Sequence, residues 1–297
     1  MLHATTQAAG KRAAFRAGLA SGKLLRFPGA FNPLSAMLIT RHGFDGIYVS
    51  GAVISADLGL PYVGLTTVSE VAGRAQQIAR VTVLPALVDA DTGFGEPMNT
   101  ARIVQLLEDA GVAGLHIDDQ VNPKCCGHLD GRDVVDQQVA VRRIKAAIAA
   151  RLDPAFVIAA RTDAAAVNGL DDAVDRAKAY VDAGADLIFP EAMTNAADFE
   201  RIRAAVDVPI LANMTEFGKG RLLDAKTLES LGVNVVIYPA TLLRLAMRAA
   251  DNGLAELAVW GTQEDLLYQM QGRQDLCELL DCQGYSAFDA SVSDFEV

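Results

Sequence analysis

The stretch VLPALVDADTGFG, residues 83–95, joins a short aliphatic run to a polar segment that contains two glycines. A short run of aliphatic residues that ends at Asp and Gly is typical of a buried parallel strand. The polar segment then stands where that strand ends. The stretch therefore predicts a parallel α/β fold with polar side chains at the carboxyl ends of its strands.

Seven other segments share this pattern of a short aliphatic run next to Gly, Pro or Asp. They are LLRFPGA (24–30), GIYVSG (46–51), GLHIDD (114–119), FVIAART (156–162), LIFPEA (187–192), VPILANM (208–214) and VNVVIYP (233–239). Helical patterns lie between the runs, as in residues 99–111 and 169–184, which close at Gly111 and Gly184. Eight strands, each followed by a helix, predict an α/β protein with a (β/α)8 TIM barrel.

A doubly wound sheet is the alternative fold. It requires a glycine fingerprint at the first turn from strand to helix, and FPGAFNP at residues 27–33 does not supply one. We therefore expect a single barrel domain over residues 1–297, with residues 252–297 as a C-terminal helical extension. Stretches such as QEDLLYQMQGRQDLCELL, residues 263–280, predict the helices of that extension.

Composition and charge argue against several classes of protein. The chain has 297 residues, of which 51% are hydrophobic, and its formal net charge is −11. It has no run rich in Lys and Arg, so nucleic acid is not an expected partner. No segment has the uninterrupted apolar length of a membrane span, and residues 1–18 lack the apolar core of a secretory signal. We expect a cytoplasmic protein that contacts no membrane.

The cysteine pattern indicates neither a disulfide framework nor a zinc site. The four cysteines are Cys125, Cys126, Cys277 and Cys282. None of them belongs to a C-x-x-C motif, and no pair of histidines has zinc-ligand spacing. Cys277 and Cys282 are interpreted as small buried hydrophobic residues.

Cys126 has a different setting, in the polar and glycine-containing stretch KCCGH at residues 124–128. A free thiol has a pKa near 8.5, and a neighbouring cation or imidazolium lowers it. Lys124 and His128 flank Cys126 and are the candidates for this effect. The stretch therefore predicts a thiol that delivers a proton near neutral pH.

Acidic residues follow two neighbouring strands. Asp89 and Asp91 are two residues apart, so strand alternation predicts that both point to the same side. Two adjacent carboxylates repel each other unless a cation lies between them. Asp118, at the end of the next strand, supplies a third acid, and oxygen ligands of this kind favour Mg²⁺ or, second, Mn²⁺. The competing interpretation is that one of these acids caps the following helix.

Arg161 at the end of a buried strand requires an anion. Glu191 is one candidate, in a structural ion pair, and a substrate carboxylate is the other, because the planar guanidinium suits a bidentate contact. Asn213 and Thr215 share one face of their strand and are candidate donors to a carboxylate.

Seven motifs occur in the order expected for one enzyme family. They are SGA, DADTGFG, GLHIDDQ, KCCGH, ARTDA, FPEA and LANMTEFG. With these motifs the sequence resembles the methylisocitrate lyases, a branch of the isocitrate lyase and phosphoenolpyruvate mutase superfamily, from about residue 12 to residue 275. The resemblance implies a carbon–carbon lyase that cleaves 2-methylisocitrate to pyruvate and succinate with Mg²⁺, in the methylcitrate cycle of propionate catabolism. It also implies a homotetramer in which the last helices swap between neighbouring barrels.

The resemblance also assigns residues to the site. Catalytic roles fall to Cys126, Arg161, Tyr48, His128 and Glu191. Contacts with the substrate fall to Ser50, Gly51, Ala52, Gly127, Asn213, Thr215, Arg244 and Arg273. The metal falls to Asp89, Asp91 and Asp118. In the first group, Cys126 is the general acid that protonates the succinate carbanion, and Tyr48 is the position associated with removing the hydroxyl proton.

The sequence departs from the family at two positions near the metal. Asp118 stands where the family usually has Glu, and Tyr62 stands where relatives commonly have Asp. Three alternatives stay open: isocitrate lyase, a dimethylmalate or 2-methylmalate lyase, and a non-catalytic barrel that binds carboxylates. Phe189 argues against the first, because isocitrate lyases tend to have a tryptophan there and the smaller ring leaves room for a methyl group.

Overall fold

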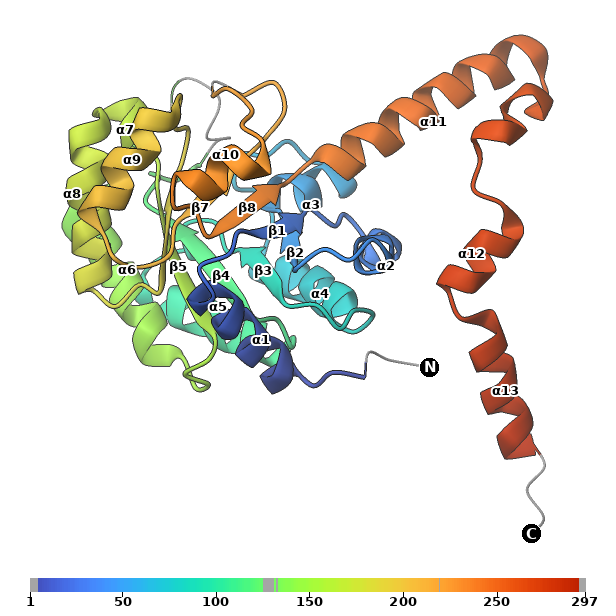
Figure 1. Ribbon diagram of the computed structural model, residues 1–297, viewed down its shortest axis with the longest axis horizontal. Coiled ribbons are helices and arrows are strands. Elements are labelled where there is room, and N and C mark those ends of the chain that lie inside the picture. Colours follow the sequence, from blue (N-terminus) through green and yellow to red (C-terminus); the bar gives the residue numbers. More distant parts are fainter. Residues whose placement is uncertain (1–4, 125–130, 132, 219, 294–297) are drawn as a thin grey trace.

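Eight short parallel strands form the centre of the computed structural model (Figure 1). The structure describes residues 5–124, 131, 133–218 and 220–293. The strands are β1 (Leu25–Pro28), β2 (Ile47–Val49), β3 (Ala86–Asp89), β4 (Gly114–Asp118), β5 (Val157–Thr162), β6 (Leu187–Pro190), β7 (Leu211–Asn213) and β8 (Val235–Tyr238). Each strand lies within one of the eight predicted segments, so the predicted strands are confirmed.

The strands close into a barrel through two sheets and two single bridges. One sheet has the order β2-β3-β4-β5-β6, and the other has the order β1-β8-β7. A parallel bridge from Gly29 to Tyr48 joins β1 to β2, and a second from Ile188 to Ile210 joins β6 to β7. The order of the strands around this ring is the order along the chain, which confirms the predicted (β/α)8 barrel.

At least one helix follows every strand, and the helices from α2 to α10 pack on the outside of the barrel (Figure 1). The helices are α1 (Ala8–Ala20), α2 (Pro33–Arg41), α3 (Gly51–Asp57), α4 (Val68–Ala79), α5 (Pro97–Asp109), α6 (Gln137–Ala150), α7 (Ala164–Val167), α8 (Leu170–Asp182), α9 (Ala196–Ala205), α10 (Ala225–Ser230), α11 (Thr241–Trp260), the 3-10 helix η1 (Glu264–Gln269), α12 (Arg273–Leu279) and α13 (Cys282–Ser293). Among the described residues, none of these helices is both long and apolar enough to span a membrane.

Local sequence explains where several helices begin and end. Asn32 opens α2 and Thr67 opens α4, each with a reciprocal capping box that satisfies two backbone N–H groups. Gly111 and Gly184 follow α5 and α8 with φ angles of 80° and 101°, a conformation that favours glycine. The two predicted helix ends are therefore confirmed.

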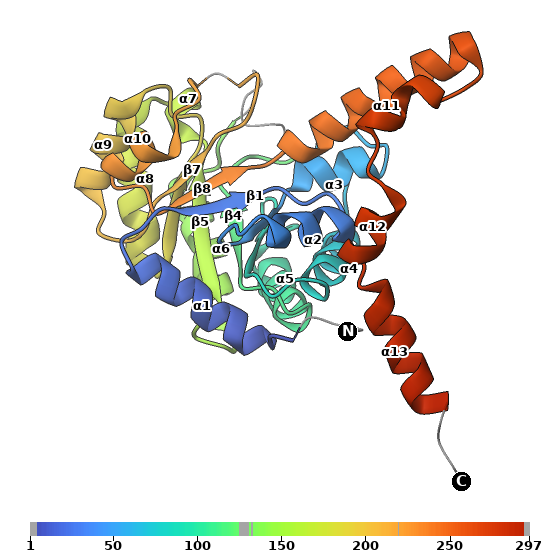
Figure 2. The same ribbon diagram turned by 45° about the vertical axis from the view of Figure 1, so that its right-hand side comes forward.

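The barrel interior is filled by alternate side chains of the strands and is closed at one end by α1. Phe27, Leu87 and Phe189 are fully buried in this inner cluster. Phe15 and Leu19 of α1 belong to the same cluster, and the Phe15 ring lies 5.1 Å from the Phe27 ring. The end that α1 covers is the one where the strands begin, so the opposite end is open to carry a site (Figure 2).

The last four helical elements, from α11 to α13, form an arm that extends away from the barrel (Figures 1 and 2). No residue of these elements is buried. The arm exposes large apolar side chains, among them Leu254, Val259, Trp260, Leu267 and Tyr268. The expected boundary of the C-terminal extension, residue 252, lies within α11, which starts at Thr241.

The interpretation of Cys277 and Cys282 as buried free thiols is wrong. They form a disulfide between α12 and α13, on the arm. The turn between the two helices places their Cα atoms 5.3 Å apart, which is within the usual range for a disulfide. Sequence spacing of five residues gave no signal for this pairing.

Candidate active site at the carboxyl ends of the strands

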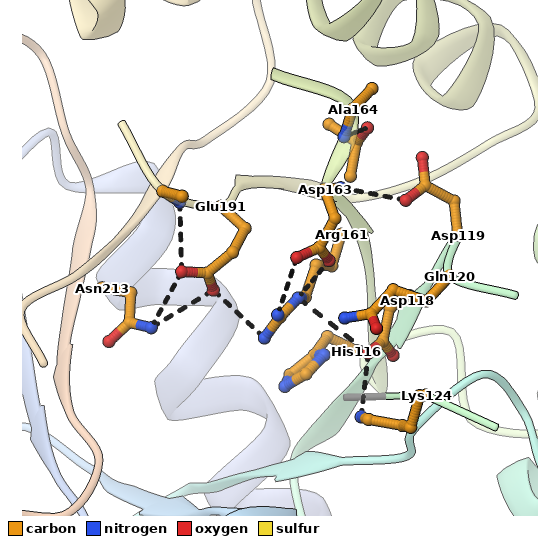
Figure 3. Close-up of polar contacts among 12 residues, drawn as sticks. His116, Asp118, Asp119, Gln120, Lys124, Arg161, Asp163, Ala164, Glu191 and Asn213 are labelled. Carbon is orange, nitrogen blue, oxygen red and sulfur yellow. Dashed lines mark hydrogen bonds and ion pairs between the residues drawn. The ribbon is translucent and has the colours of Figure 1, made fainter. Parts of the chain in front are cut away.

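Polar side chains converge where the strands of the larger sheet end (Figure 3). Tyr48 lies on β2, Asp89 on β3, Asp118 on β4 and Arg161 on β5, and all four are buried. Glu191 directly follows β6 and has no exposed surface. A barrel end built only for stability would not concentrate so many buried ionisable groups, because each one loses hydration.

Asp89, His116 and Asp118 form a candidate metal centre. Their nearest ligand atoms all lie within 4.8 Å of one another, and all three residues are buried. Asp118 Oδ1 is buried and has no hydrogen-bond partner among the described residues. An unpartnered carboxylate oxygen on a residue of this triad fits a divalent cation, which would satisfy it.

His116 was not among the predicted site residues. It precedes Asp118 by two positions on β4, so strand alternation places both side chains on the same side. This two-residue spacing was the feature of the sequence that could have identified His116 as a site residue. Burial lowers the pKa of His116, although the Asp89 and Asp118 carboxylates oppose the shift, so the imidazole is neutral and can serve as a ligand.

Asp91 does not lie on a strand beside Asp89, although the sequence predicted that it would. Strand β3 ends at Asp89, and Asp91 lies in the following turn with a φ of 49°, so strand alternation does not apply to it. Its backbone N–H donates to Asp89 Oδ1 at 3.0 Å. Gly93 follows in the same turn, and a Cβ there would lie 2.3 Å from the Thr100 hydroxyl oxygen, so this turn requires glycine.

Lys124 places its ammonium among the predicted metal-binding acids. Its Nζ lies 2.5 Å from Asp91 Oδ1, 2.8 Å from Asp118 Oδ2 and 3.7 Å from Asp89 Oδ1. Burial would lower the pKa of Lys124, but the three carboxylates outweigh burial and raise the pKa above its usual value. Lys124 is therefore a cation of this cluster, and its predicted effect on the Cys126 thiol stays a prediction because Cys126 lies outside the described residues.

Two tyrosines contact the same cluster. Tyr48 Oη and His116 Nε2 share a hydrogen bond at 2.8 Å. Burial first, and then the Asp89 charge, raise the pKa of Tyr48 well above its usual value, so its phenol is protonated. Tyr62 donates to Asp89 Oδ2 at 2.8 Å, so the residue that departs from the family pattern contacts the cluster through a neutral hydroxyl.

Arg161 is held by two acids on neighbouring strand ends (Figure 3). Its Nε and Nη2 donate to the two carboxylate oxygens of Asp163 at 2.9 and 3.1 Å. Its Nη1 lies 3.1 Å from Glu191 Oε2. The structural ion pair with Glu191 is thus present, and Asp163 is an additional partner that sequence analysis missed. The bidentate contact fixes the guanidinium plane and its position.

A buried network behind the strand ends supports Asp163. Asp119 Oδ1 accepts from the Asp163 backbone N–H at 2.9 Å, and Asp119 Oδ2 accepts from Tyr180 Oη at 2.8 Å. Arg176 Nη1 donates to the same Oδ2 at 3.2 Å. Tyr180 and Arg176 both belong to α8, so this helix braces Arg161 through two successive carboxylates.

The predicted donors to the substrate divide into those near this cluster and those away from it. Ser50, Gly51 and Ala52 form the start of α3, and the Gly51 N–H donates to Asp89 Oδ2 at 3.1 Å. Asn213 donates through Nδ2 to both Glu191 oxygens at 3.3 and 3.2 Å. The start of α3 therefore contacts the acidic cluster, and Asn213 contacts Glu191, the ion-pair partner of Arg161.

Other predicted residues do not join this group. Arg244 lies on α11, 3.6 Å from Glu216, with its guanidinium over the Phe217 ring. Thr215 is half-buried beyond β7, and Arg273 opens α12, which lies apart from the barrel (Figure 1). Cys126, Gly127 and His128 lie outside the described residues.

A cavity of about 620 Å³ opens beside the acidic cluster. Its lining includes Thr66, Asp91, Arg102, Asn122 and Lys124. The cavity gives a polar ligand access to the carboxylates from the side of α4 and α5, and it has the size of a small-molecule site.

Comparison with known proteins agrees with this arrangement. Residues 15–258 match the family model described as phosphoenolpyruvate phosphomutase. The chain is 61% identical to "Probable 2-methylisocitrate lyase 2" of Corynebacterium glutamicum, over 95% of this chain and 92% of that protein. It is 44% identical to the 2-methylisocitrate lyase of Aeropyrum pernix, over 90% of this chain and 86% of that protein.

Solved structures of related enzymes share the fold. Oxaloacetate acetylhydrolase in complex with 3,3-difluorooxalacetate superposes with a TM-score of 0.91 at 30% identity, covering 98% of this chain and 100% of that one. 2,3-dimethylmalate lyase superposes with a TM-score of 0.90 at 31% identity, covering 97% of this chain and 96% of that one. Phosphonopyruvate hydrolase, solved with oxalate and Mg²⁺, gives 0.86 and 29%, with 94% and 98% covered. The barrel, the acids at its strand ends and these matches together place the chain in the phosphoenolpyruvate phosphomutase family, within the isocitrate lyase and phosphoenolpyruvate mutase superfamily.

Proposed function

We propose that this protein is a carbon–carbon lyase that cleaves 2-methylisocitrate to pyruvate and succinate, as in the methylcitrate cycle of propionate catabolism. The observation that carries the proposal is a buried acidic cluster, suited to a divalent cation, beside a buried and braced arginine. The 61% identity to a protein named as a probable 2-methylisocitrate lyase supports the choice of substrate.

The cation we propose is Mg²⁺, with Mn²⁺ as a substitute. Asp89 and Asp118 would hold it, with Asp91 and His116 close by, because oxygen-rich sites favour these hard ions. When bound, the ion supplies Lewis acidity that stabilises negative charge on the hydroxyl and carboxylate oxygens of the substrate. Tyr62 and the Gly51 N–H hold Asp89 in place through its Oδ2.

Arg161 stabilises the pyruvate oxygen as the bond breaks. The substrate hydroxyl loses its proton to give a negatively charged oxygen, and this charge is lost as the carbonyl of pyruvate forms. Arg161 is buried with a fixed guanidinium plane, and a preorganised charge in such surroundings acts more strongly than one in water. The start of α3 at Ser50, Gly51 and Ala52 would hold the pyruvate carboxylate. Tyr48 would take up the hydroxyl proton while its own phenolic proton passes to His116 Nε2 across their shared hydrogen bond.

Cleavage leaves an electron pair on the succinate carbon, and a proton must reach this carbon before the fragments recombine. We assign the proton to the Cys126 thiol, on the strength of the KCCGH motif, with Gly127 and His128 beside it. The thiolate then regains its proton from solvent. Glu191, Asn213, Thr215, Arg244 and Arg273 are assigned to the succinate side.

Release of pyruvate tests this function. We expect pyruvate from 2-methylisocitrate with Mg²⁺, measured by coupled oxidation of NADH with lactate dehydrogenase, and none after EDTA treatment. A panel of isocitrate, 2,3-dimethylmalate and 2-methylmalate measures specificity, and one methyl group changes kcat/KM by roughly 10- to 200-fold. If no member of the panel yields pyruvate while the protein still binds carboxylates, the non-catalytic barrel is the correct alternative.

We also propose a homotetramer that exchanges its arms. Arg273 lies on an arm that stands apart from its own barrel, and the arm exposes Leu254, Trp260 and Tyr268. A neighbouring barrel would bury these apolar side chains and receive Arg273 at its site. Light scattering after gel filtration is expected to give about four times the 31.4 kDa chain mass, and a chain ending at residue 251 should lose that assembly. A monomeric mass for the full chain would contradict the proposal.

A further inference from the structure

Lys124 is the only ammonium group described in contact with the acidic cluster, and it occupies the middle of that cluster. Its Nζ lies 2.5 Å from Asp91 and 2.8 Å from Asp118, with Asp89 at 3.7 Å. The side chain is 1% exposed, so these carboxylates and not water provide its stabilisation. Figure 3 shows Lys124 reaching Asp118 from the chain segment that follows β4.

A second contact holds the ammonium where it is. Lys124 Nζ lies 4.6 Å from the centre of the Tyr62 ring, within reach of a cation–π interaction. Tyr62 is in turn fixed by its hydrogen bond to Asp89. Tyr62 thus serves the cluster twice, with its hydroxyl on a carboxylate and its ring face on the cation.

The ammonium and a divalent cation would use the same ligands. Asp89 and Asp118 contribute to the candidate metal triad, and both are within 4.0 Å of Lys124 Nζ. A divalent ion bound to both carboxylates would stand only a few ångströms from the ammonium, and like charges at such distances in a buried site repel strongly. The two cations therefore exclude each other from this cluster.

We propose that Lys124 is an internal counter-ion that occupies the cation position of the acidic cluster and must be displaced when a divalent metal binds. The inference rests on the proposed metal site and adds a residue that opposes metal binding. Without metal, the ammonium neutralises acids that would otherwise repel each other. With metal, the same charge is released from the cluster.

The test measures metal affinity on the full-length apo protein without substrate. Mn²⁺ chloride is titrated and free Mn²⁺ is read by electron paramagnetic resonance. Lys124→Met removes the competing charge and keeps the aliphatic stem, so we expect the Kd for Mn²⁺ to fall at least tenfold. Lys178→Met is the matched control, because Lys178 is an exposed lysine of α8 paired with Asp175. It changes net charge equally, and the Kd should stay within twofold.

Thermal unfolding gives an independent readout. Without metal, Lys124→Met should melt below the wild type because three acids lose their counter-ion. Saturating Mn²⁺ should raise the melting temperature of the variant more than that of the wild type. An equal increase in both proteins would count against competition.

If Lys124→Met does not fold, amine labelling of the wild type decides the question. Acetic anhydride followed by peptide mass spectrometry should label Lys124 more in Mn²⁺-saturated protein than in apo protein, with Lys178 labelled equally in both. Unchanged labelling of Lys124, or an unchanged or weaker Kd in a folded Lys124→Met variant, overturns the inference. Absence of Mn²⁺ binding in both wild type and variant is a different failure, because it removes the metal site and with it the proposed function.

Discussion

Replacement of Arg161 by glutamine is expected to lower kcat for pyruvate release by about a hundred- to a thousandfold, the usual effect of removing one preorganised charge from a reacting oxygen. Arg161 is 6% exposed and is fixed by Asp163 and Glu191, so no mobile group or water replaces it. KM should change much less than kcat, because the charge is needed most in the transition state.

Two further variants separate catalysis from folding in this experiment. Removal of the guanidinium leaves Asp163 and Glu191 without their cation, so the melting temperature of each variant must be measured. Arg161→Lys keeps the charge but loses the planar fork, and it should retain an intermediate kcat. Arg201→Gln, at an exposed ion pair with Asp171, is the control and should behave as wild type. A well-folded Arg161→Gln variant with nearly full kcat would refute the role.

Cys126→Ser is expected to lose turnover by about a hundred- to ten-thousandfold, the contribution typical of a general acid. A serine hydroxyl is far less acidic than a thiol, so it cannot deliver the proton to the succinate carbon near neutral pH. The substitution removes no charge and little volume. Affinity for succinate or for a substrate analogue, measured by calorimetry, should therefore remain close to that of the wild type.

The adjacent cysteine provides a matched comparison. Cys125→Ser introduces the same chemical change one residue away, and it should keep most of the activity because the resemblance gives Cys125 no chemical role. Equal losses in the two variants would mean that the stretch is sensitive to any substitution and would remove the assignment of Cys126. Full activity in Cys126→Ser would do the same.

Much of the fold could be predicted because buried parallel strands leave a strong local signal. A strand such as β5 has both faces covered, so it reads as an aliphatic run that stops at Arg161 and Thr162. Strand ends then identify one edge of the barrel, and polar residues there are easily assigned to a common site. This is why Asp89, Asp118, Arg161 and Glu191 could be expected near one another.

The remaining features depend on contacts that sequence spacing does not encode. Asp91 departs from strand alternation because its φ of 49° begins a turn, and one residue of irregular backbone redirects a side chain. Lys124 reaches Asp91 and Asp89 from a segment more than thirty positions later along the chain. Asp163 lies just beyond the end of β5 and was not predicted as a partner of Arg161, although its two-residue spacing from Arg161 could have indicated an ion pair.

The two single bridges that close the barrel lie between its two sheets, and the site residues are distributed unequally between these sheets. Tyr48, Asp89, Asp118, Arg161 and the strand before Glu191 all belong to the five-stranded ladder, whereas Asn213 belongs to the three-stranded one. Thermal separation of the strands would begin at the two single bridges, where few backbone hydrogen bonds must break. Opening between β6 and β7 would separate Asn213 from Glu191, whereas Asp89, Asp118 and Arg161 would stay together in the five-stranded sheet. The seam between β6 and β7 thus crosses the site between Glu191 and Asn213, whereas neither seam separates the acids of the cluster from Arg161.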